Sequence, residues 1–145
     1  MEYFEDLEVG VAHTVGEFEL REEDIIRFAS EWDPQPFHVD PEAARRTPMG
    51  GITASACHIM AVAAWLMRYQ KPLAVIAAAR HEFDLLNPAR PGDRISKTST
   101  CLEKRPSKSK PDRGIAIFDS LLKTQAGTEI ARLRSTIVVA RRGQG

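Results

Sequence analysis

The segment Ile52–Gln70 constrains the fold more than any other part of this chain of 145 residues. Apolar side chains fill almost every position of the segment, so it has no polar face to turn towards water. A helix that is apolar all round has to be covered by other structure. Its most apolar run, Ile59–Met67, is too short to span a bilayer. We therefore expect a long central helix, buried inside a folded domain.

The rest of the chain supplies elements that can wrap this helix. Apolar residues at helical spacing and an acidic first turn predict an amphipathic helix over Glu22–Trp32. Ile115–Lys123 is apolar on both faces, which predicts a central strand. Further strands are predicted near 18–20 and over 80–86, 94–103 and 131–140, with turns at 88–93 and 125–128. These elements favour one α+β domain over residues 1–145, an antiparallel sheet wrapped around the central helix.

Composition excludes several functional classes. Lys plus Arg and Asp plus Glu number 20 each, so no basic field points to nucleic acid. Cys57 and Cys101 stand alone without metal-site spacing, and we expect buried free thiols rather than a disulfide or a metal centre. The segment Met1–Asp6 is acidic and does not resemble a signal peptide. We expect a cytoplasmic protein with no membrane segment and no metal.

The segment Asp33-Pro34-Gln35-Pro36-Phe37-His38 places a carboxylate and an imidazole five residues apart. Each proline fixes its own φ and restricts the residue before it. We expect a stiff, irregular loop rather than a helix, suited to holding an acid/base pair around one small reactant. Taken alone, the segment favours an ordinary interpretation, in which Asp33 ends a helix and His38 is a loop histidine.

The start of the central helix is a second candidate site. Gly50 and Gly51 precede it and let a ligand approach the backbone closely. The N–H groups of its first turn, near Thr53–Ser55, have no partner within the helix and favour negative charge. These residues predict a site for an anion or a developing oxyanion.

Taken together, these motifs resemble the MaoC-like dehydratase family, the (R)-specific enoyl-CoA hydratases of the hotdog fold. Residues 33–40, Asp-Pro-Gln-Pro-Phe-His-Val-Asp, are similar to the family's Asp-x-Asn-Pro-x-His motif, with Gln35 in place of Asn. Gly50-Gly51-Ile52 opens the central helix as in family members, and the turn 88–93 is similar to theirs. Ala54-Ser55 stands where the family commonly has His-Gly.

The resemblance implies reversible addition of water to a trans-2-enoyl thioester, giving an (R)-3-hydroxyacyl thioester. It assigns catalysis to Asp33 and His38, and contact with the thioester oxygen to the helix start. The residues expected at that contact or around the substrate are Ser55, Ala54, Gly51 and Gln35. The implied substrate is an acyl-CoA or an acyl-carrier-protein thioester, with no separate cofactor. The implied assembly is a homodimer whose sheets join edge to edge.

Coenzyme A carries phosphates, so we expect basic residues near the mouth of the site. The basic connection between the predicted strands supplies the first candidates, namely Arg105, Lys108, Lys110 and Arg113. A solvated loop is an equally good interpretation of that stretch. Arg45 and Arg46, which follow the motif, are a second pair of candidates.

Two alternatives from other classes remain open. A hotdog thioesterase would use an acidic residue near the helix to direct water at the carbonyl, but such enzymes lack the Asp–His pair. A silent acyl-thioester-binding subunit of a heterodimer is the other, although this chain retains both Asp33 and His38. Outside these motifs, we expect His58 to be a hydrogen-bonded core or interface histidine, and Trp32, Phe37 and Trp65 to line the core or the pocket.

Overall fold

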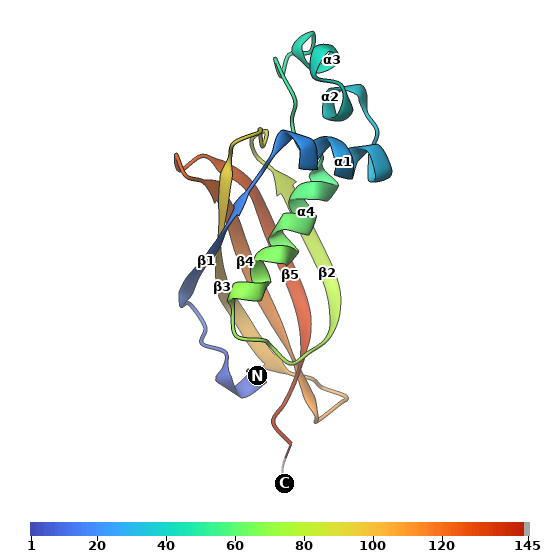
Figure 1. The fold of residues 1–145 in the computed structure, drawn as a ribbon. Helices are drawn as coiled ribbons and strands as arrows, with labels where there is room; N and C mark the ends of the chain where they lie inside the picture. The colour runs from blue at the N-terminus through green and yellow to red at the C-terminus, as the bar shows by residue number, and fades with distance from the viewer. Residues whose placement is uncertain (144–145) are drawn as a thin grey trace.

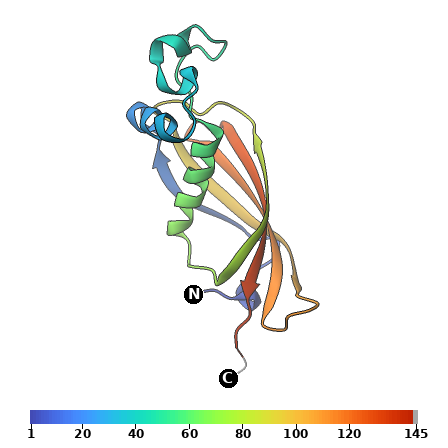
Figure 2. The same cartoon turned by 90° about the vertical axis from the view of Figure 1, so that its right-hand side faces the viewer.

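A five-stranded antiparallel sheet curls around helix α4 in this computed structural model, which describes residues 1–143 (Figures 1 and 2). The domain expected over 1–145 thus extends two residues beyond the described range. In chain order the elements are η1 (Phe4–Asp6), β1 (Ala12–Glu19), α1 (Glu22–Trp32), α2 (Pro36–Val39), α3 (Pro41–Arg45), α4 (Ala56–Trp65), η2 (Leu66–Tyr69), β2 (Val75–Leu85), β3 (Arg94–Pro106), β4 (Arg113–Thr124) and β5 (Glu129–Ala140).

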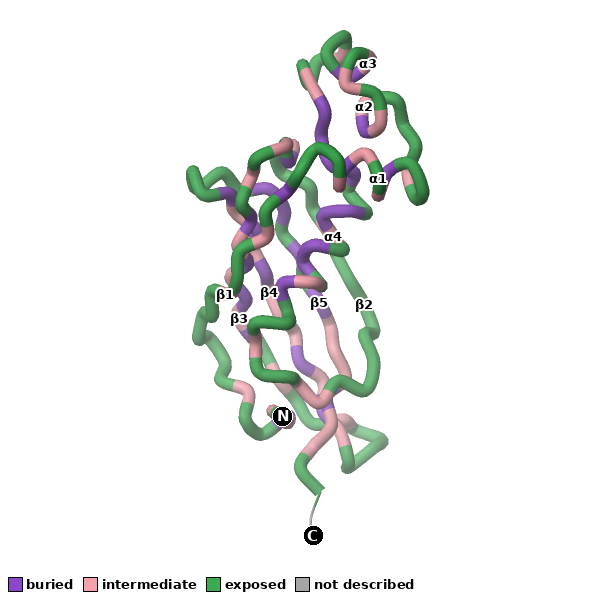
Figure 3. The backbone as a smooth tube through the Cα atoms, viewed as in Figure 1, coloured by how far each residue is buried: buried purple, intermediate pink, exposed green. Residues whose placement is uncertain are grey.

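The strands lie in the order β1-β3-β4-β5-β2, and every neighbouring pair is antiparallel. β4 is the central strand, as its two apolar faces predict. β1 and β2 form the two edges, and β2 is exposed along almost its whole length (Figure 3). An exposed edge of eleven residues presents a row of unpaired backbone groups that another strand can bond.

The central helix is shorter than predicted. It begins at Ala56 rather than Ile52, and after Trp65 it continues only as the 3-10 turn η2. The β-branched Ile52 and Thr53 favour extended backbone. The N–H of Ala54 is bonded to the carbonyl of Ala89 at 2.9 Å, which ties this segment to a neighbouring loop instead of a helix.

Three strand predictions also need correction. The strand predicted over 80–86 is β2, which begins earlier, at Val75. The first strand starts at Ala12, not near Phe18, because β1 is a polar edge strand whose exposed residues give no alternation. A bulge interrupts it at Gly16, whose φ of +57° and close contact with Tyr69 and Leu66 require a residue without a side chain. β3 runs on to Pro106 past a bulge after Cys101, so part of the basic stretch is strand.

The main core lies between α4 and the concave face of the sheet. Ile59 and Val62 of α4 and Leu66 of η2 pack with the strand residues Ile95, Leu122 and Leu133. Phe37 and Trp65 pack against this core as expected, but Trp32 is 67% exposed at the end of α1. Cys101 is buried, whereas Cys57 is exposed on the outer face of α4, contrary to the expectation for both thiols.

Candidate active site

Helices α1 and α2 hold Asp33 and His38 on either side of a tight connection above the sheet (Figure 1). Asp33 caps the C-terminus of α1 and its N–H bonds the carbonyl of Ala29 at 2.8 Å. The N–H of Gln35 bonds back to the carbonyl of Asp33, also at 2.8 Å. Pro36 then starts α2, so His38 lies in a single helical turn rather than in the irregular loop that was predicted. Pro at the first helical position lacks only an N–H that would be unpaired anyway.

The two side chains face each other at a buried position. His38 Nε2 lies 3.7 Å from Asp33 Oδ2, and the side chains are 9% and 30% exposed. His38 Nδ1 lies 2.5 Å from the carbonyl oxygen of Thr53. A carbonyl only accepts hydrogen bonds, so Nδ1 carries the proton and donates it. The lone pair of neutral His38 is therefore on Nε2, the nitrogen that faces Asp33.

The segment that anchors His38 also leads into the N-terminus of α4. Ser55 is fully buried and its Oγ accepts the N–H of His58 at 3.1 Å, so Ser55 is the N-cap. The N–H of Ala54 is already bonded to Ala89, which removes Ala54 from the predicted oxyanion contacts. The contact expected near Thr53–Ser55 stays a prediction, and we now expect it at the observed helix start, where the backbone N–H groups of Ser55–Cys57 have no partner within the helix.

The cap makes a prediction about stability. Ser55→Ala removes the acceptor for the N–H of His58 and should lower the free energy of unfolding by about 1 kcal/mol. Ser55→Gly should lose only a few tenths as a cap. Urea denaturation of the two variants beside the wild type measures both changes. Equal stability of Ser55→Ala and the wild type would contradict the capping role.

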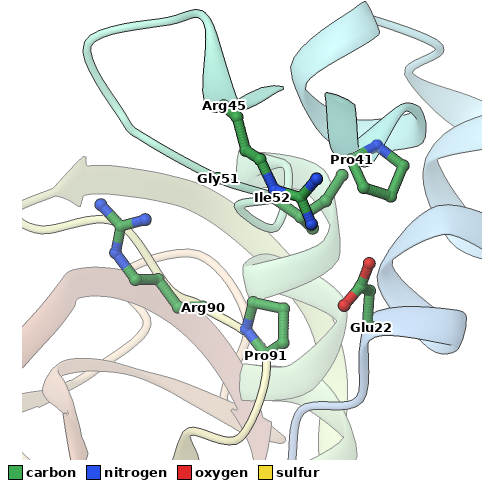
Figure 4. A pocket seen from close by; sticks show the side chains of 7 residues that line it. All are labelled: Glu22, Pro41, Arg45, Gly51, Ile52, Arg90 and Pro91. Atoms are coloured by element: carbon green, nitrogen blue, oxygen red, sulfur yellow. The ribbon is translucent and has the colours of Figure 1, made fainter. Parts of the chain in front are cut away.

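A small hollow of about 270 Å³ lies beside the same segment, lined by Gly51 and Ile52. Figure 4 shows two arginines around it: Arg45 of α3 and Arg90 of the loop before β3, with Glu22 on a third side. Arg45 was a predicted phosphate contact, whereas Arg90 was not. Arg90 is distant from Arg45 in the sequence, and the fold brings both to the same hollow. The backbone N–H of Arg90 bonds the Asp93 carboxylate in the turn that leads into β3.

Comparison with known proteins decides the family. The family model described as MaoC like domain matches residues 8–116. The chain belongs to the MaoC-like domain family. A MaoC-like dehydratase from Rhodospirillum rubrum is 39% identical, with 99% of each chain covered and a TM-score of 0.93. The fold is the hotdog that the sequence resemblance implied.

Two further proteins are similar to this MaoC-like chain at lower sequence identity. The protein YdeM of Bacillus subtilis (strain 168) is 26% identical over 129 residues, which cover 87% of this chain and 89% of YdeM. The unliganded (R)-hydratase PhaJ1 from Pseudomonas aeruginosa is 20% identical, with a TM-score of 0.79, and the match covers 97% of this chain and 86% of that one. PhaJ1 shares the fold. Within residues 1–143, no helix combines the length and apolarity needed to cross a membrane.

The basic stretch of the MaoC-like chain lies at the far end of the sheet from Asp33 and His38. Helix α1 directly follows the residues that bond the start of β3, whereas Arg105 lies at the other end of β3. The strand has 13 residues, so its ends are separated by about 40 Å at ~3.3 Å per residue. One chain therefore does not bring Arg105, Lys108, Lys110 or Arg113 to the hollow. Arg113 is paired with Asp112 at 2.8 Å.

His58 is buried as expected and stacks on Phe28 with 4.5 Å between ring centroids. Its Nδ1 has no hydrogen-bond partner among the described residues, contrary to the expected bonded histidine. Burial lowers the pKa of His58, while the charge of Asp24 opposes that change. The surroundings of the ring therefore favour its neutral form, as suits a packing residue of α4.

A second cavity, of about 870 Å³, extends below α4 over the concave face of the sheet. Lys97 lines this cavity and is only 5% exposed. It was not among the residues predicted for a site. Lys97 Nζ donates to the carbonyl of Ala63 at 3.3 Å and lies 2.9 Å from Met67 Sδ. The alternation of Ile95, Lys97 and Ser99 along β3 was the available signal, since it puts the lysine on the same face as a core isoleucine.

Lys97 weakens the fold at neutral pH. Burial lowers its pKa from 10.5 to about 8, a difference worth about 3 kcal/mol. Because the folded-state pKa is the lower one, this cost is full below pH 8 and disappears as the pH rises towards 10.5. Lys97→Met should therefore raise the free energy of unfolding at pH 7 by about 3 kcal/mol and by progressively less above pH 8.

Urea denaturation at neutral and alkaline pH tests this prediction. Lys123→Met on β4 is the matched control and should change stability by less than about 0.5 kcal/mol. A destabilised Lys97→Met at pH 7 would contradict the argument, because it would show that the ammonium group contributes more through its two contacts than its burial costs.

Proposed function

We propose that this MaoC-like protein is a hydro-lyase that adds water reversibly to a trans-2-enoyl thioester and forms an (R)-3-hydroxyacyl thioester. The observation that carries the proposal is the orientation of His38, whose Nδ1–H bonds the Thr53 carbonyl, so that Nε2, the acceptor nitrogen of the neutral ring, faces the Asp33 carboxylate. Family membership supports it. So does the fold shared with PhaJ1, which is named as an (R)-hydratase.

The Asp33–His38 pair offers two acceptors to a single water molecule. One hydrogen of the water is directed to Nε2 and the other to the carboxylate. As the water oxygen bonds to C3 of the enoyl group, one member of the pair takes its proton, and the pair delivers a proton to C2. The net change is addition of one water, and both groups return to their starting state. General acid–base catalysis of this kind contributes about 10²- to 10⁴-fold.

Negative charge develops on the thioester oxygen as C3 is attacked. The first turn of α4 supplies backbone N–H donors from Ser55–Cys57, and it follows within a few residues the Thr53 carbonyl that holds His38. Preorganised donors of this kind are worth roughly 3–4 kcal/mol each in the transition state. The helix start thus stabilises the thioester oxygen, while the Asp33–His38 pair acts at C3 and C2 of the same conjugated group.

The carrier is a CoA or acyl-carrier-protein thioester, and we assign its phosphate contact to Arg45 and Arg90. Both line the hollow beside Gly51, next to the segment that leads to Ser55. The more distant Arg105, Lys108, Lys110 and Arg113 can serve a site only if it belongs to a second chain. The exposed β2 edge supports a homodimer joined through that strand.

A thioesterase is the alternative enzyme, and its products distinguish it from a hydratase. It would release free thiol, whereas hydration keeps the thioester intact and removes the enoyl double bond. Crotonyl-CoA and longer trans-2-enoyl-CoAs should lose the enoyl absorbance without release of thiol, and the product should have the (R) configuration. Thiol release at the rate of enoyl loss would replace hydration by hydrolysis. Binding of CoA thioesters without either reaction would indicate a silent partner subunit.

A further inference from the structure

The floor of the larger cavity carries a row of polar side chains among the apolar residues Phe118, Leu133 and Ile137. Lys97 and Ser99 of β3 lie on the concave face of the sheet, and Ser99 Oγ is bonded to Ser120 Oγ of β4 at 2.9 Å. Ser135 of β5 bonds His81 Nδ1 of β2 at 2.8 Å. Register pairs Ser99 with Ser120 and His81 with Ser135, so the polar side chains cross the sheet from β3 to β2. A cavity kept only for packing would be lined by apolar groups here.

Lys97 is a buried cation with no carboxylate paired to it among residues 1–143. Its two contacts are a carbonyl oxygen and a thioether sulfur, and burial alone accounts for its lowered pKa, with no charged neighbour contributing. Buried charges are ordinarily paired. The carboxylates Glu2, Asp6 and Glu8 line the cavity only where the N-terminal segment borders it, and Asp6 is paired with Arg142. An anion entering the floor would give Lys97 the charged partner that the described part of the chain does not provide.

Helix α4 connects this floor with the catalytic end. Its exposed face carries the small residues Cys57, Ala61 and Ala64, spaced so that they follow one side of the helix. Ala64 also lines the cavity, together with Met60 and Met67. From Ser55 to Ala63, whose carbonyl accepts from Lys97, the helix rises about 12 Å at 1.5 Å per residue. A medium-length acyl chain with its thioester oxygen at the helix start can therefore reach Lys97.

From this arrangement we infer the substrate class: the enzyme acts on acyl thioesters that carry a carboxylate at the end remote from the thioester, and Lys97 binds that carboxylate. The inference rests on the proposed hydration. Met60, Ala64 and Met67 contact the methylene chain, while the ammonium group and the neighbouring Ser99 hydroxyl receive the charged end. The buried ammonium group of Lys97 then lowers the stability of the fold at neutral pH but determines which substrate binds.

The test compares two substrates that differ only at the remote end. These are trans-2-octenoyl-CoA and the CoA monothioester of trans-2-octenedioic acid, which ends in a carboxylate. The wild type should prefer the carboxylate substrate in kcat/KM by about tenfold or more, the usual worth of a hydrogen bond to a charged group. Lys97→Met should abolish or reverse that preference, mainly through KM, while Lys123→Met should keep it.

A wild type that prefers the methyl-ended substrate, or an unchanged preference in Lys97→Met, would overturn the inference. Because the readout is a ratio within each variant, partial misfolding does not imitate it. Binding of free octanedioate to the whole protein by calorimetry is independent of turnover and should be lost in Lys97→Met. If neither crotonyl-CoA nor either of the two eight-carbon substrates is hydrated, the proposed function fails. In that case octanedioate binding that depends on Lys97 still supports the anion site, and binding that does not overturns it.

Discussion

Asp33→Asn should lower kcat for hydration of trans-2-enoyl-CoA by about 10²- to 10⁴-fold while the protein stays folded. Asparagine keeps the size of the side chain but is no longer a base, and its NH₂ group cannot accept a hydrogen from the water. Asp33 is 30% exposed and caps α1 through its backbone N–H, which the substitution leaves in place. The loss should therefore appear in catalysis rather than in stability.

Asp40→Asn is the matched control for Asp33→Asn. Asp40 lies in the same short region, but its Oδ1 accepts the N–H groups of Glu42 and Ala43 as the N-cap of α3. Asparagine caps helices about as well as aspartate does. Activity of Asp40→Asn should stay close to the wild type. An equal loss in both variants would show that the motif acts by holding the loop and not through the Asp33 carboxylate.

His38→Gln should lose activity on the same scale, because Nε2 is the other acceptor for the water. Glutamine can still donate to the Thr53 carbonyl, so the buried bond at 2.5 Å has a replacement donor. The double variant Asp33→Asn/His38→Gln then decides whether the two groups act together. Residues that act as a unit are strongly non-additive. The double variant should be about as slow as the slower single variant, and losses that multiply would indicate two independent roles.

The proximity of Asp33 and His38 and the layers of the fold could be predicted from the sequence, since their signals are local. Helix α1 has the predicted bounds, Glu22–Trp32, because its acidic first turn and Pro34 mark both ends. The Asp40 cap followed by Pro41 predicts α3 in the same way. β4 is central because it is apolar on both faces.

What the sequence missed depends on contacts between distant segments. Apolar residues 52–55 extend the helical pattern, yet the bond from Ala54 to Ala89 holds them out of the helix. His38 gains its fixed tautomer from a carbonyl fifteen residues away. Arg90 lies in the loop before β3 and Lys97 lies on β3. Each joins its site only when the sheet packs over α4. The basic stretch is conspicuous in the sequence as a run of charged residues. Strand β3 places it at the end of the sheet opposite Asp33 and His38.

The initial rate of enoyl absorbance loss with crotonyl-CoA, measured for the wild type beside Asp33→Asn and Asp40→Asn, tests the central claim most directly. We predict rapid loss with the wild type and Asp40→Asn, and a rate lower by about 10²-fold or more with Asp33→Asn. Wild-type rates in Asp33→Asn would contradict the assignment of the Asp33–His38 pair as the group that activates water.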